Sequence, residues 1–386
     1  MKSIFHLLIA FYCLTLVEAK ENCVRIEVTN PMDMERTEVV SVRWSEIKKI
    51  MPEINSSEIS VSEVSSENSI MHQLIDENND GMPEELLFLA NVKANEKKTF
   101  YVKAGKKETK PVISLTDARF MPPREDIAWE NDRIAFRIYG PALAKEVNNG
   151  IDVWTKRVRY LIVEKWYRGD EAPGDQRISY HEDHGEGADF FSVGRTLGAG
   201  SCALFKDDSL YQPGVFETYK IITTGPIRAI FEVTYKPVEY NGRKVSEVKK
   251  YTLDAGGNLN KIDVTYICSP TEGNLVFATG LVKRANVTSY KNKDQGWVSL
   301  WGQTNDKIEN GYLGTGIVMP AEMIDSIKED DVHVLIIGKA KPGREVTYYA
   351  GAGWTRSGDF NNADDWNNYL KNFALKLKQP LKVSVK

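Results

Sequence analysis

The sequence predicts a mainly β protein, a large sandwich with one amphipathic helix near the C-terminus. Two observations carry this prediction. Strand-like apolar runs recur through the chain and most are separated by Gly, Asn, Asp or Pro, whereas clear helical spacing in the second half is confined to residues 363–377. With 42% hydrophobic residues in a chain of 386, there is ample material for one large core. Many long strands with few helices are typical of a sandwich.

The first 19 residues, MKSIFHLLIAFYCLTLVEA, predict a secretory signal peptide that is cleaved after Ala19. Lys2 precedes an apolar run that is too short to span a bilayer comfortably. We therefore expect a periplasmic or secreted protein with no membrane association in its mature form. The four cysteines are Cys13, Cys23, Cys202 and Cys268. Because the first lies in the leader, the other three allow at most one bridge and exclude a disulfide scaffold.

Two regions follow the leader. Residues 20–110 are expected to form an N-terminal β region packed on the main sandwich, which takes residues 111–386. The lysine-rich end of the first region fits a solvated hairpin and linker. Residues 52–70, rich in Ser and Glu, predict a loop or a sheet edge. The net charge of −4 and the lack of a basic block exclude nucleic acid as a partner, whereas a homo-oligomer is compatible with the sequence.

Within the main region, Asn241-Gly242 is the best hairpin-turn dipeptide in the chain. The helix predicted at residues 363–377 has acids at its start and spaces Trp366 and Leu370 one turn apart. The predicted strands are residues 132–140, 159–167, 227–235, 248–256 and 259–267.

An acidic loop in the N-terminal region raises the question of a metal. Asp76, Asn78 and Asp80 match the opening of a calcium loop with oxygen ligands. Leu87 stands where an EF-hand needs its bidentate Glu, so Glu84 would have to complete a shorter loop between two strands. A plain Asn-Asp-Gly hairpin turn with exposed acids explains the same residues, and the calcium site is kept as an alternative.

The segment ISYHEDHGEGADFFSVGRTLGAG, residues 178–200, concentrates titratable groups. His181 and His184 could hold Zn²⁺ with an acid of the same segment as third ligand. Gly185 and Gly187 make a helix unlikely there, because each costs about 1 kcal/mol relative to Ala. A looped backbone separates the two imidazoles, so zinc is the less favoured interpretation, and a polar loop with no chemistry also remains open.

An acid–base site is the favoured interpretation of this segment. Tyr180, His181 and His184 supply groups that can accept or donate a proton. Arg195 adds a partner for a carboxylate. The sequence therefore predicts that one short segment supplies the reactive groups of a site.

Aromatic residues suggest how a ligand would be held. Trp154, Trp301 and Trp354 stand next to glycines and charged residues, as tryptophans that stack on sugar rings often do. Core positions are the alternative, because such large side chains dominate burial. Lys156 and Glu186 would hold sugar hydroxyls.

Seven motifs occur together in this order: ENDRIAFRIYGP (130–141), NGIDVWTKR (149–157), YHEDHGEGADFFSVGRTLGAG (180–200), GPIRAIFEV (225–233), YTLDAGGNLNKIDV (251–264), GWVSLWG (296–302) and AGAGWTRSGDF (350–360). In combination they resemble the DUF4861 family, secreted proteins of polysaccharide-degrading Bacteroidetes-type bacteria, over residues 25–386. The resemblance implies a galactose-mutarotase-like β-supersandwich. It also implies a role in the breakdown of uronic-acid glycans, similar to an oligosaccharide dehydratase that acts on ulvan fragments.

Elimination from a uronide needs a base for the C5 proton, a cation for the carboxylate, and an acid for the leaving oxygen at C4. We expect His184 as base, Tyr180 or His181 as acid, and Arg195 as carboxylate partner. Dehydration of a terminal uronic acid and lyase cleavage both need these parts. The alternatives are a carbohydrate-binding protein without turnover, and an epimerase or glycoside hydrolase on the same fold. A hydrolase would take its two carboxylates from Asp183, Glu186 and Asp189.

Overall fold

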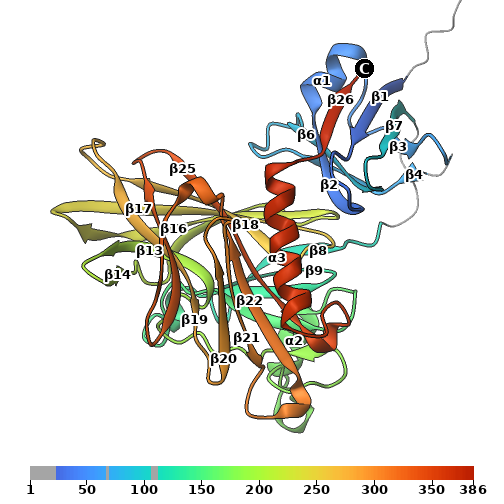
Figure 1. Ribbon diagram of the computed structural model, residues 1–386. Helices are drawn as coiled ribbons and strands as arrows, with labels where there is room; N and C mark the ends of the chain where they lie inside the picture. The colour runs from blue at the N-terminus through green and yellow to red at the C-terminus, as the bar shows by residue number, and fades with distance from the viewer. Residues whose placement is uncertain (1–22, 67–68, 106–111) are drawn as a thin grey trace, which may run out of the picture.

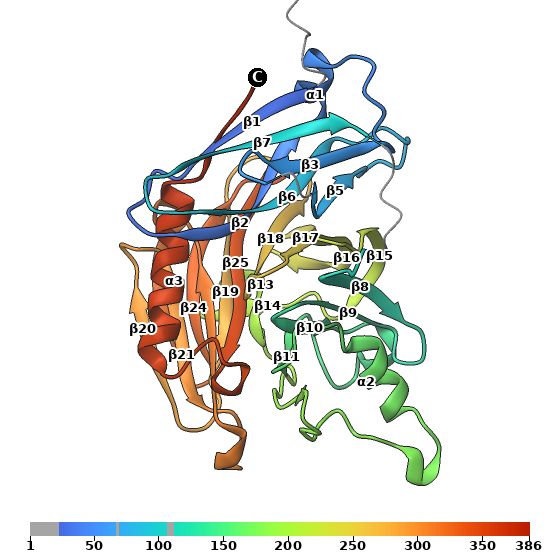
Figure 2. The same cartoon turned by 90° about the vertical axis from the view of Figure 1, so that its right-hand side faces the viewer.

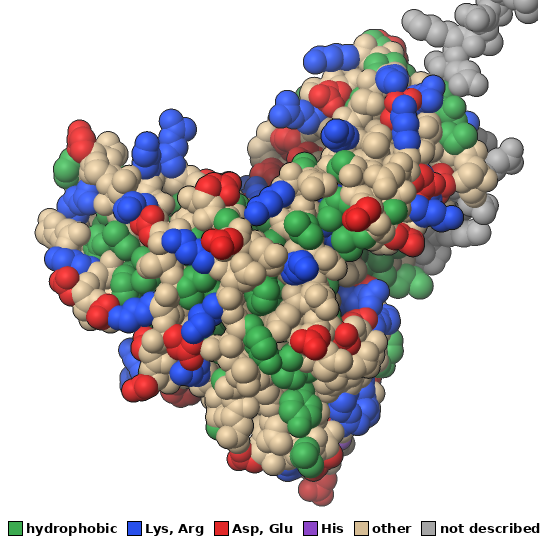
Figure 3. Space-filling model, viewed as in Figure 1, with side chains coloured by type: hydrophobic (Ala, Val, Ile, Leu, Met, Phe, Trp, Pro, Cys, Tyr) green, Lys and Arg blue, Asp and Glu red, His purple; other side chains and the backbone are tan. Residues whose placement is uncertain are grey.

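The computed structural model describes residues 23–66, 69–105 and 112–386, and it is mainly β, as predicted. The predicted signal peptide lies outside the described residues. Within the described ranges, no helix is long and apolar enough to cross a membrane. On the face shown in Figure 3, acidic and basic side chains are interspersed rather than gathered by sign.

An eight-stranded antiparallel sheet forms one layer of the main region (Figure 1). The dipeptide Asn241-Gly242 joins two of its strands with both residues at positive φ, as the hairpin prediction requires. In spatial order, the strands are β15 (Phe216–Thr223), β16 (Arg228–Tyr240), β17 (Arg243–Asp254), β18 (Leu259–Ile267), β25 (Glu345–Trp354), β22 (Tyr312–Val318), β21 (Trp297–Gln303) and β20 (Val287–Asn292).

Two five-stranded antiparallel sheets form the second layer. The first contains β12 (Gly187–Ala188), β11 (Asp152–Lys156), β10 (Ile134–Ile138), β9 (Asp126–Asn131) and β8 (Thr116–Met121). The second contains β14 (Ser209–Tyr211), β13 (Ala199–Lys206), β19 (Leu275–Val282), β24 (His333–Ala340) and β23 (Ile324–Glu329). The largest apolar core lies between the layers, because it takes buried residues from strands of all three sheets. This is the large sandwich that the alternating runs predict.

The N-terminal region has its own smaller core between two sheets. One sheet contains β26 (Lys382–Val385), β1 (Cys23–Thr29), β7 (Lys97–Ala104), β3 (Ile59–Glu63) and β4 (Ser69–Ile70), and the other contains β2 (Arg36–Arg43), β6 (Glu85–Val92) and β5 (His72–Ile75). Helix α1 (Trp44–Ile50) follows β2. The last strand of the chain thus pairs with the first (Figure 1). The N-terminal unit therefore includes the C-terminal strand, which the expected boundary at residue 110 did not anticipate.

The N-terminal unit packs on the main sandwich through both apolar and polar contacts. Ile75 and Leu87 form a small buried cluster with Ile230 of the eight-stranded sheet. The Gln73 side chain accepts from the backbone N–H of Arg228 at 2.8 Å and donates to its carbonyl oxygen at 3.0 Å. These contacts fix strand β16 of the large sheet against the small unit.

Helix α3 (Ala363–Lys378) covers the outer face of the eight-stranded sheet, as its amphipathic pattern predicts (Figure 1). The Asn362 side chain caps it by accepting from the backbone N–H of Asp365 at 3.0 Å. Trp366 and Leu370, on the inner face of the helix, are fully buried. Short 3₁₀ turns occupy Pro141–Leu143, Gly174–Gln176, Ile308–Asn310, Ala321–Met323 and Thr355–Ser357.

The strand predicted at residues 159–167 is wrong, because helix α2 (Val163–Asp170) begins there. Glu130, from strand β9, accepts from the backbone N–H groups of Ile162 and Val163 at 2.7–2.9 Å. A carboxylate from a distant strand therefore satisfies the first turn of the helix. Figure 2 shows α2 and α3 on different sides of the sandwich.

The Ser- and Glu-rich stretch at residues 52–70 includes β3 and the sheet-edge strand β4, in keeping with the predicted loop or edge. Cys202 and Cys268 are free thiols, so these two cysteines are not bridged to each other.

Candidate functional site

The outer face of strands β9, β10 and β11 carries charged side chains. Along β10, Phe136 points into the main core while its neighbour Arg137 points outward. Asp126 of β9 and Asp152 of β11 lie beside it on the same outer face. These three strands are nonetheless buried throughout, because α2 and the segment 178–191 cover them. Charged groups that are buried on a sheet face need partners, and their presence indicates a site.

Three carboxylates surround the guanidinium of Arg137, and we call these four residues the charged cluster. The Arg137 nitrogens lie 2.6 Å from Asp152, 3.1 Å from Asp189 and 3.7 Å from Asp126. Tyr139 donates to Asp152 at 3.0 Å. One guanidinium faces three acids, so the cluster has an excess of negative charge when all three acids are ionised.

Burial decides how the acids of the cluster titrate. Loss of solvent raises the pKa of Asp126 to about 6, although the Arg137 charge and a hydrogen bond from Tyr167 oppose the shift. Burial and the neighbouring Asp152 charge raise the pKa of Asp189 well above its usual range. One carboxylate oxygen of Asp126 and one of Asp189 have no hydrogen-bond partner among the described residues. The cluster therefore retains protons at a pH where exposed aspartates have lost theirs.

Tyr180 is a buried residue that lies against this cluster. Its ring stacks on Trp154 with the centroids 4.7 Å apart, and its hydroxyl oxygen accepts hydrogen bonds from Arg124 and Arg137. Arg124 is held by Asp170, and its guanidinium carbon lies 5.2 Å from the Tyr180 ring centroid. Burial raises the pKa of Tyr180, with the two guanidinium charges opposing that effect, so the side chain is a neutral phenol.

His181 lies directly against Tyr180, with ring centroids 4.5 Å apart. Its Nδ1 lies 3.1 Å from the backbone carbonyl oxygen of Asp189 and 3.5 Å from the Asp189 carboxylate. A carbonyl oxygen only accepts hydrogen bonds, so Nδ1 carries a proton, and Nε2 is the ring nitrogen that remains for other contacts. Because 57% of the His181 side chain is exposed, this nitrogen is accessible to a ligand.

Two cavities meet at Tyr180. The first, which we call the arginine cavity, has a volume of about 540 Å³ and is lined by Arg124, Arg137, His181 and Asp189. The second, the α2 cavity, has a volume of about 870 Å³ and lies between helix α2 and the segment 178–187. Tyr180 lines both of them. Both volumes are in the range of small-molecule sites.

Local contacts hold the segment 178–187 in its looped form. The Asp183 carboxylate accepts from the backbone N–H groups of Gly185 and Gly187 at 2.8 and 3.0 Å, and it lies 3.4 Å from Arg356. Gly187 pairs with β11 so closely that a Cβ would come within 2.0 Å of the Thr155 carbonyl oxygen. Only glycine allows this approach, and its φ of +118° also favours glycine.

The four residues predicted to be catalytic are divided by the fold. Tyr180 and His181 line the arginine cavity, whereas His184 lines the α2 cavity, so the imidazoles face different spaces. Arg195 lines neither cavity. It donates instead to the Lys145 carbonyl oxygen and to Asn148, both at 3.2 Å. The structure therefore brings Tyr180 and His181 together in the arginine cavity, places His184 with Tyr180 in the α2 cavity, and places Arg195 in neither.

The predicted sugar platforms are core residues. Trp154 has no exposed surface and packs against Tyr180 and the aromatic residues of α2. Trp301 packs under helix α3, and Trp354 donates its indole N–H to the Asn310 carbonyl oxygen within the core. All eight tryptophans are at most 8% exposed, so none offers a free ring face. The platform prediction fails because the strands that carry these residues are covered on both sides.

The two predicted hydroxyl-binding residues have different environments. Lys156 is buried and forms an ion pair with Glu130 at 2.6 Å, so it is not available to a ligand. Burial lowers the pKa of Lys156 and raises that of Glu130, against the effect of their mutual attraction. Glu186 lines the α2 cavity and accepts hydrogen bonds from Tyr160, Lys165 and Trp166.

The predicted calcium ligands form hydrogen bonds with backbone amides of their own loop. The Asp76 carboxylate accepts from the backbone N–H groups of Asp80 and Gly81 at 3.2 and 2.8 Å, and Asn78 accepts from the former amide at 2.8 Å. Glu84 accepts from the Glu77 amide. These bonds build a turn between β5 and β6. Across residues 23–66, 69–105 and 112–386, no three His, Cys, Asp or Glu side chains gather as metal ligands, at this loop or at His181 and His184.

Sequence reasoning missed Arg124, Arg137, Asp126 and Asp152. A signal was available, because the strands DIAWEN, IAFRI and DVWTK each place a charge among apolar residues. In a strand that is buried on both faces, such charges must meet one another.

Comparison with known proteins concerns the whole chain. A protein of Formosa agariphila called "Uncharacterized protein P7" is 33% identical over 383 residues, which cover 93% of each chain. Among solved structures, a glycosyl hydrolase family 38 protein of Enterococcus faecalis aligns with a TM-score of 0.49 at 11% identity, covering 95% of this chain and 48% of that one. An α-mannosidase of Enterococcus faecalis V583 aligns with a TM-score of 0.46 at 9% identity, covering 95% and 46%.

This chain spans about half the length of those two solved structures. The model of the family described as "Domain of unknown function (DUF4861)" matches residues 28–383. The chain therefore belongs to the DUF4861 family.

Proposed function

We propose that this protein is a carbohydrate-active enzyme that acts by elimination on oligosaccharides ending in a uronic acid. One observation carries the proposal. A neutral phenol, two guanidinium groups and an imidazole of fixed tautomer meet in the arginine cavity. These are the acid, the carboxylate partner and the base that elimination needs.

Arg124 is proposed to bind the carboxylate of the uronic acid. Its side chain is 28% exposed, against 8% for Arg137, and both line the cavity. A guanidinium that pairs with the carboxylate stabilises the negative charge that builds up as the C5 proton leaves. Arg137, held by Asp152 and Asp189, positions the Tyr180 hydroxyl.

His181 is proposed as the base that removes the C5 proton through Nε2. The Asp189 carbonyl oxygen fixes its tautomer, and the imidazolium formed in this step lies 3.5 Å from the Asp189 carboxyl group. His181 takes this role in place of His184, because the latter faces the α2 cavity.

Tyr180 is proposed as the acid. Its oxygen accepts from both arginines, so its own hydrogen is free to be donated to the leaving oxygen at C4. The C5–H electrons form the C4–C5 double bond, the C4–O bond breaks, and the leaving oxygen takes the phenol proton. The two guanidiniums then stabilise the phenolate. A leaving hydroxyl gives water, and a leaving sugar gives a chain fragment.

The test is a panel of uronic-acid-ended oligosaccharides, with ultraviolet absorbance and product mass as readouts. The conjugated double bond of an elimination product absorbs, whereas hydrolysis and epimerisation products do not. We expect wild-type turnover to fall at least 100-fold in Tyr180→Phe and in His181→Ala, the size of general acid–base effects. His72→Ala is the matched control, because that histidine lies in strand β5 of the N-terminal unit.

Several outcomes would contradict the proposal. Products without absorbance would indicate hydrolysis or epimerisation. Binding without turnover on the entire panel would indicate a binding protein. Full activity in His181→Ala, with loss in His184→Ala, would move the base to the α2 cavity and overturn the assignment of the arginine cavity.

A further inference from the structure

The α2 cavity is larger than the arginine cavity, and the proposed chemistry does not use it. It is lined by Lys165 and Trp166 of α2 and by Glu182, His184 and Glu186 of the segment 178–187. An outer space of about 400 Å³ shares Glu182 and His184 with it, so the cavity opens outward along the segment 178–184. It reaches the reactive groups only at Tyr180, which lines both cavities.

We propose that the α2 cavity binds the sugar next to the terminal uronic acid, and that this sugar is uncharged. The inference rests on the proposed function, since it places the uronic acid in the arginine cavity. Tyr180 lines both cavities, so the α2 cavity adjoins the space proposed for the uronic acid. The α2 cavity is the adjoining space with room for a sugar.

The polar groups of this cavity are held in fixed positions. Glu186 accepts from Tyr160, from Lys165 at 2.7 Å and from the Trp166 indole at 3.2 Å. A carboxylate offers about four acceptor positions, so about one remains for a ligand hydroxyl. The Asp183 contacts with the backbone of residues 185 and 187 hold the same wall. Preorganised acceptors of this kind suit a ligand rich in hydroxyl groups.

The charge of the cavity argues against an anionic sugar. Each cation that lines it is already paired, Lys165 with Glu186, and Arg119 and Arg168 with Glu164. Glu182 is exposed and has no ion-pair partner in the described part of the chain. A second uronate or a sulfated sugar would meet this uncompensated negative charge, whereas a neutral sugar would not.

The test compares three substrates: the uronic acid alone, a disaccharide with a neutral second sugar, and a disaccharide with a second uronic acid. We expect the wild-type KM for the neutral disaccharide to be about tenfold lower than for the other two, the effect of one well-formed hydrogen bond to a charged group. Glu186→Gln should reduce this preference for the neutral disaccharide at least threefold. Glu182→Gln should lower the KM for the disaccharide with a second uronic acid two- to fivefold, the range for an exposed charge.

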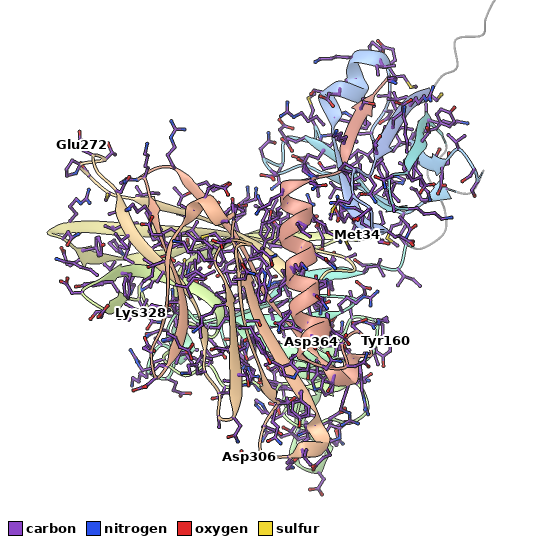
Figure 4. All side chains as sticks on the ribbon, in the orientation of Figure 1. Met34, Tyr160, Glu272, Asp306, Lys328 and Asp364 are labelled. Carbon is purple, nitrogen blue, oxygen red and sulfur yellow. The ribbon has the colours of Figure 1, made fainter. Side chains whose placement is uncertain are left out.

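Glu272→Gln is the matched control, because Figure 4 places Glu272 far from Tyr160, whose hydroxyl bonds to Glu186. It should leave all three KM values unchanged. Equal KM values for the three substrates, unaffected by Glu186→Gln, would overturn the inference while the elimination activity stands.

Equilibrium binding of the neutral disaccharide separates the two proposals. If no substrate turns over, but wild type binds this disaccharide several-fold more tightly than Glu186→Gln does, the cavity assignment stands and the proposed function fails. Absence of both turnover and Glu186-dependent binding would reject both.

Discussion

Two helices cover the outer faces of two sheets in this protein, and the surfaces beneath them are chemically opposite. Helix α3 lies on a mainly apolar face of the eight-stranded sheet, where Trp366 and Leu370 pack in a hydrophobic cluster. Helix α2 and the segment after it cover a face that holds Arg137, Asp126 and Asp152. A covering helix therefore buries apolar side chains at α3 and encloses charged side chains at α2.

The apolar face has been shaped for close packing. A Cβ at Gly314 would come within 2.6 Å of the Trp366 ring, and one at Gly316 within 2.6 Å of Leu370. The two glycines let α3 approach the sheet directly. No comparable benefit comes from the charged face, because burying ions costs more than their attraction returns unless every group is well paired. The difference teaches that the apolar face contributes close packing, whereas the charged face buries ionisable groups at a cost in stability.

The largest expected effect is on the α2 side, from Glu130→Gln. The change removes the ion-pair partner of buried Lys156 and weakens the acceptor for the first turn of α2. We expect unfolding free energy to fall by about 3–5 kcal/mol, the cost of an uncompensated buried charge. Urea denaturation measures it.

Glu164→Gln, in helix α2 itself, is the control. That acid is exposed, so its loss should cost under ~1 kcal/mol. Equal effects of the two changes would show that Glu130 has no special role in holding α2.

On the α3 side, Trp366→Ala should lower unfolding free energy by a similar ~3–5 kcal/mol, the usual cost of removing a buried tryptophan. The change should leave catalysis unaffected, because α3 lines neither cavity. Activity per folded molecule should stay near wild type. A large loss of turnover in the folded variant would contradict the separation between the two faces.

Asp126→Asn should stabilise the protein at neutral pH. The folded-state pKa of about 6 lies above the ordinary 3.8, so the stability that Asp126 contributes is complete below pH 3.8 and is lost as the pH rises through 6. The ionisation cost at pH 7 reaches ~3 kcal/mol, and asparagine avoids it while keeping an acceptor for Tyr167.

Denaturation at pH 4, 5, 6 and 7 is the measurement. Wild type and variant should differ most at pH 7 and converge near pH 4. A variant less stable than wild type at pH 7 would mean that the ionised carboxylate, paired with Arg137, is worth more than its burial costs.

The smallest effect is expected at the start of α3, where Asn362 caps the helix through its own side chain. Asn362→Ala should cost about 1 kcal/mol, because one backbone N–H loses its acceptor. Comparison with Glu130→Gln contrasts a cap from the residue just before the helix with a cap from a separate strand. A cost near that of Glu130→Gln would indicate that Asn362 has a tertiary role.

More of the fold than of the candidate site could be predicted from the sequence. Alternation predicted β16, β17 and β18, and helical spacing predicted α3, because these elements bury one regular face. The misreading of residues 159–167 has a physical cause. Val163, Trp166 and Tyr167 suit a strand by residue type, and the helix forms because Glu130 binds its first amides.

For the site, the sequence singled out the segment 178–200, and the structure places the rings of Tyr180 and His181 from this segment against each other. It could not show that His184, three residues later, faces another cavity, or that Arg195 bonds to a backbone carbonyl elsewhere. The direction of a looped side chain depends on contacts with distant elements, such as those of Asp183 with Arg356 and Arg157.

By itself, the sequence determined the mainly β class, the terminal helix, the hairpin at Asn241-Gly242 and the family, since each depends on residues near one another in the chain or on the ordered motifs. Only the tertiary structure decided which charges meet. Arg137, Asp152 and Asp189 come from three separate segments, and they interact because antiparallel pairing and the covering loop bring them to one buried face. Electrostatic interactions depend on distance in space and on burial, and neither is written in the order of the residues.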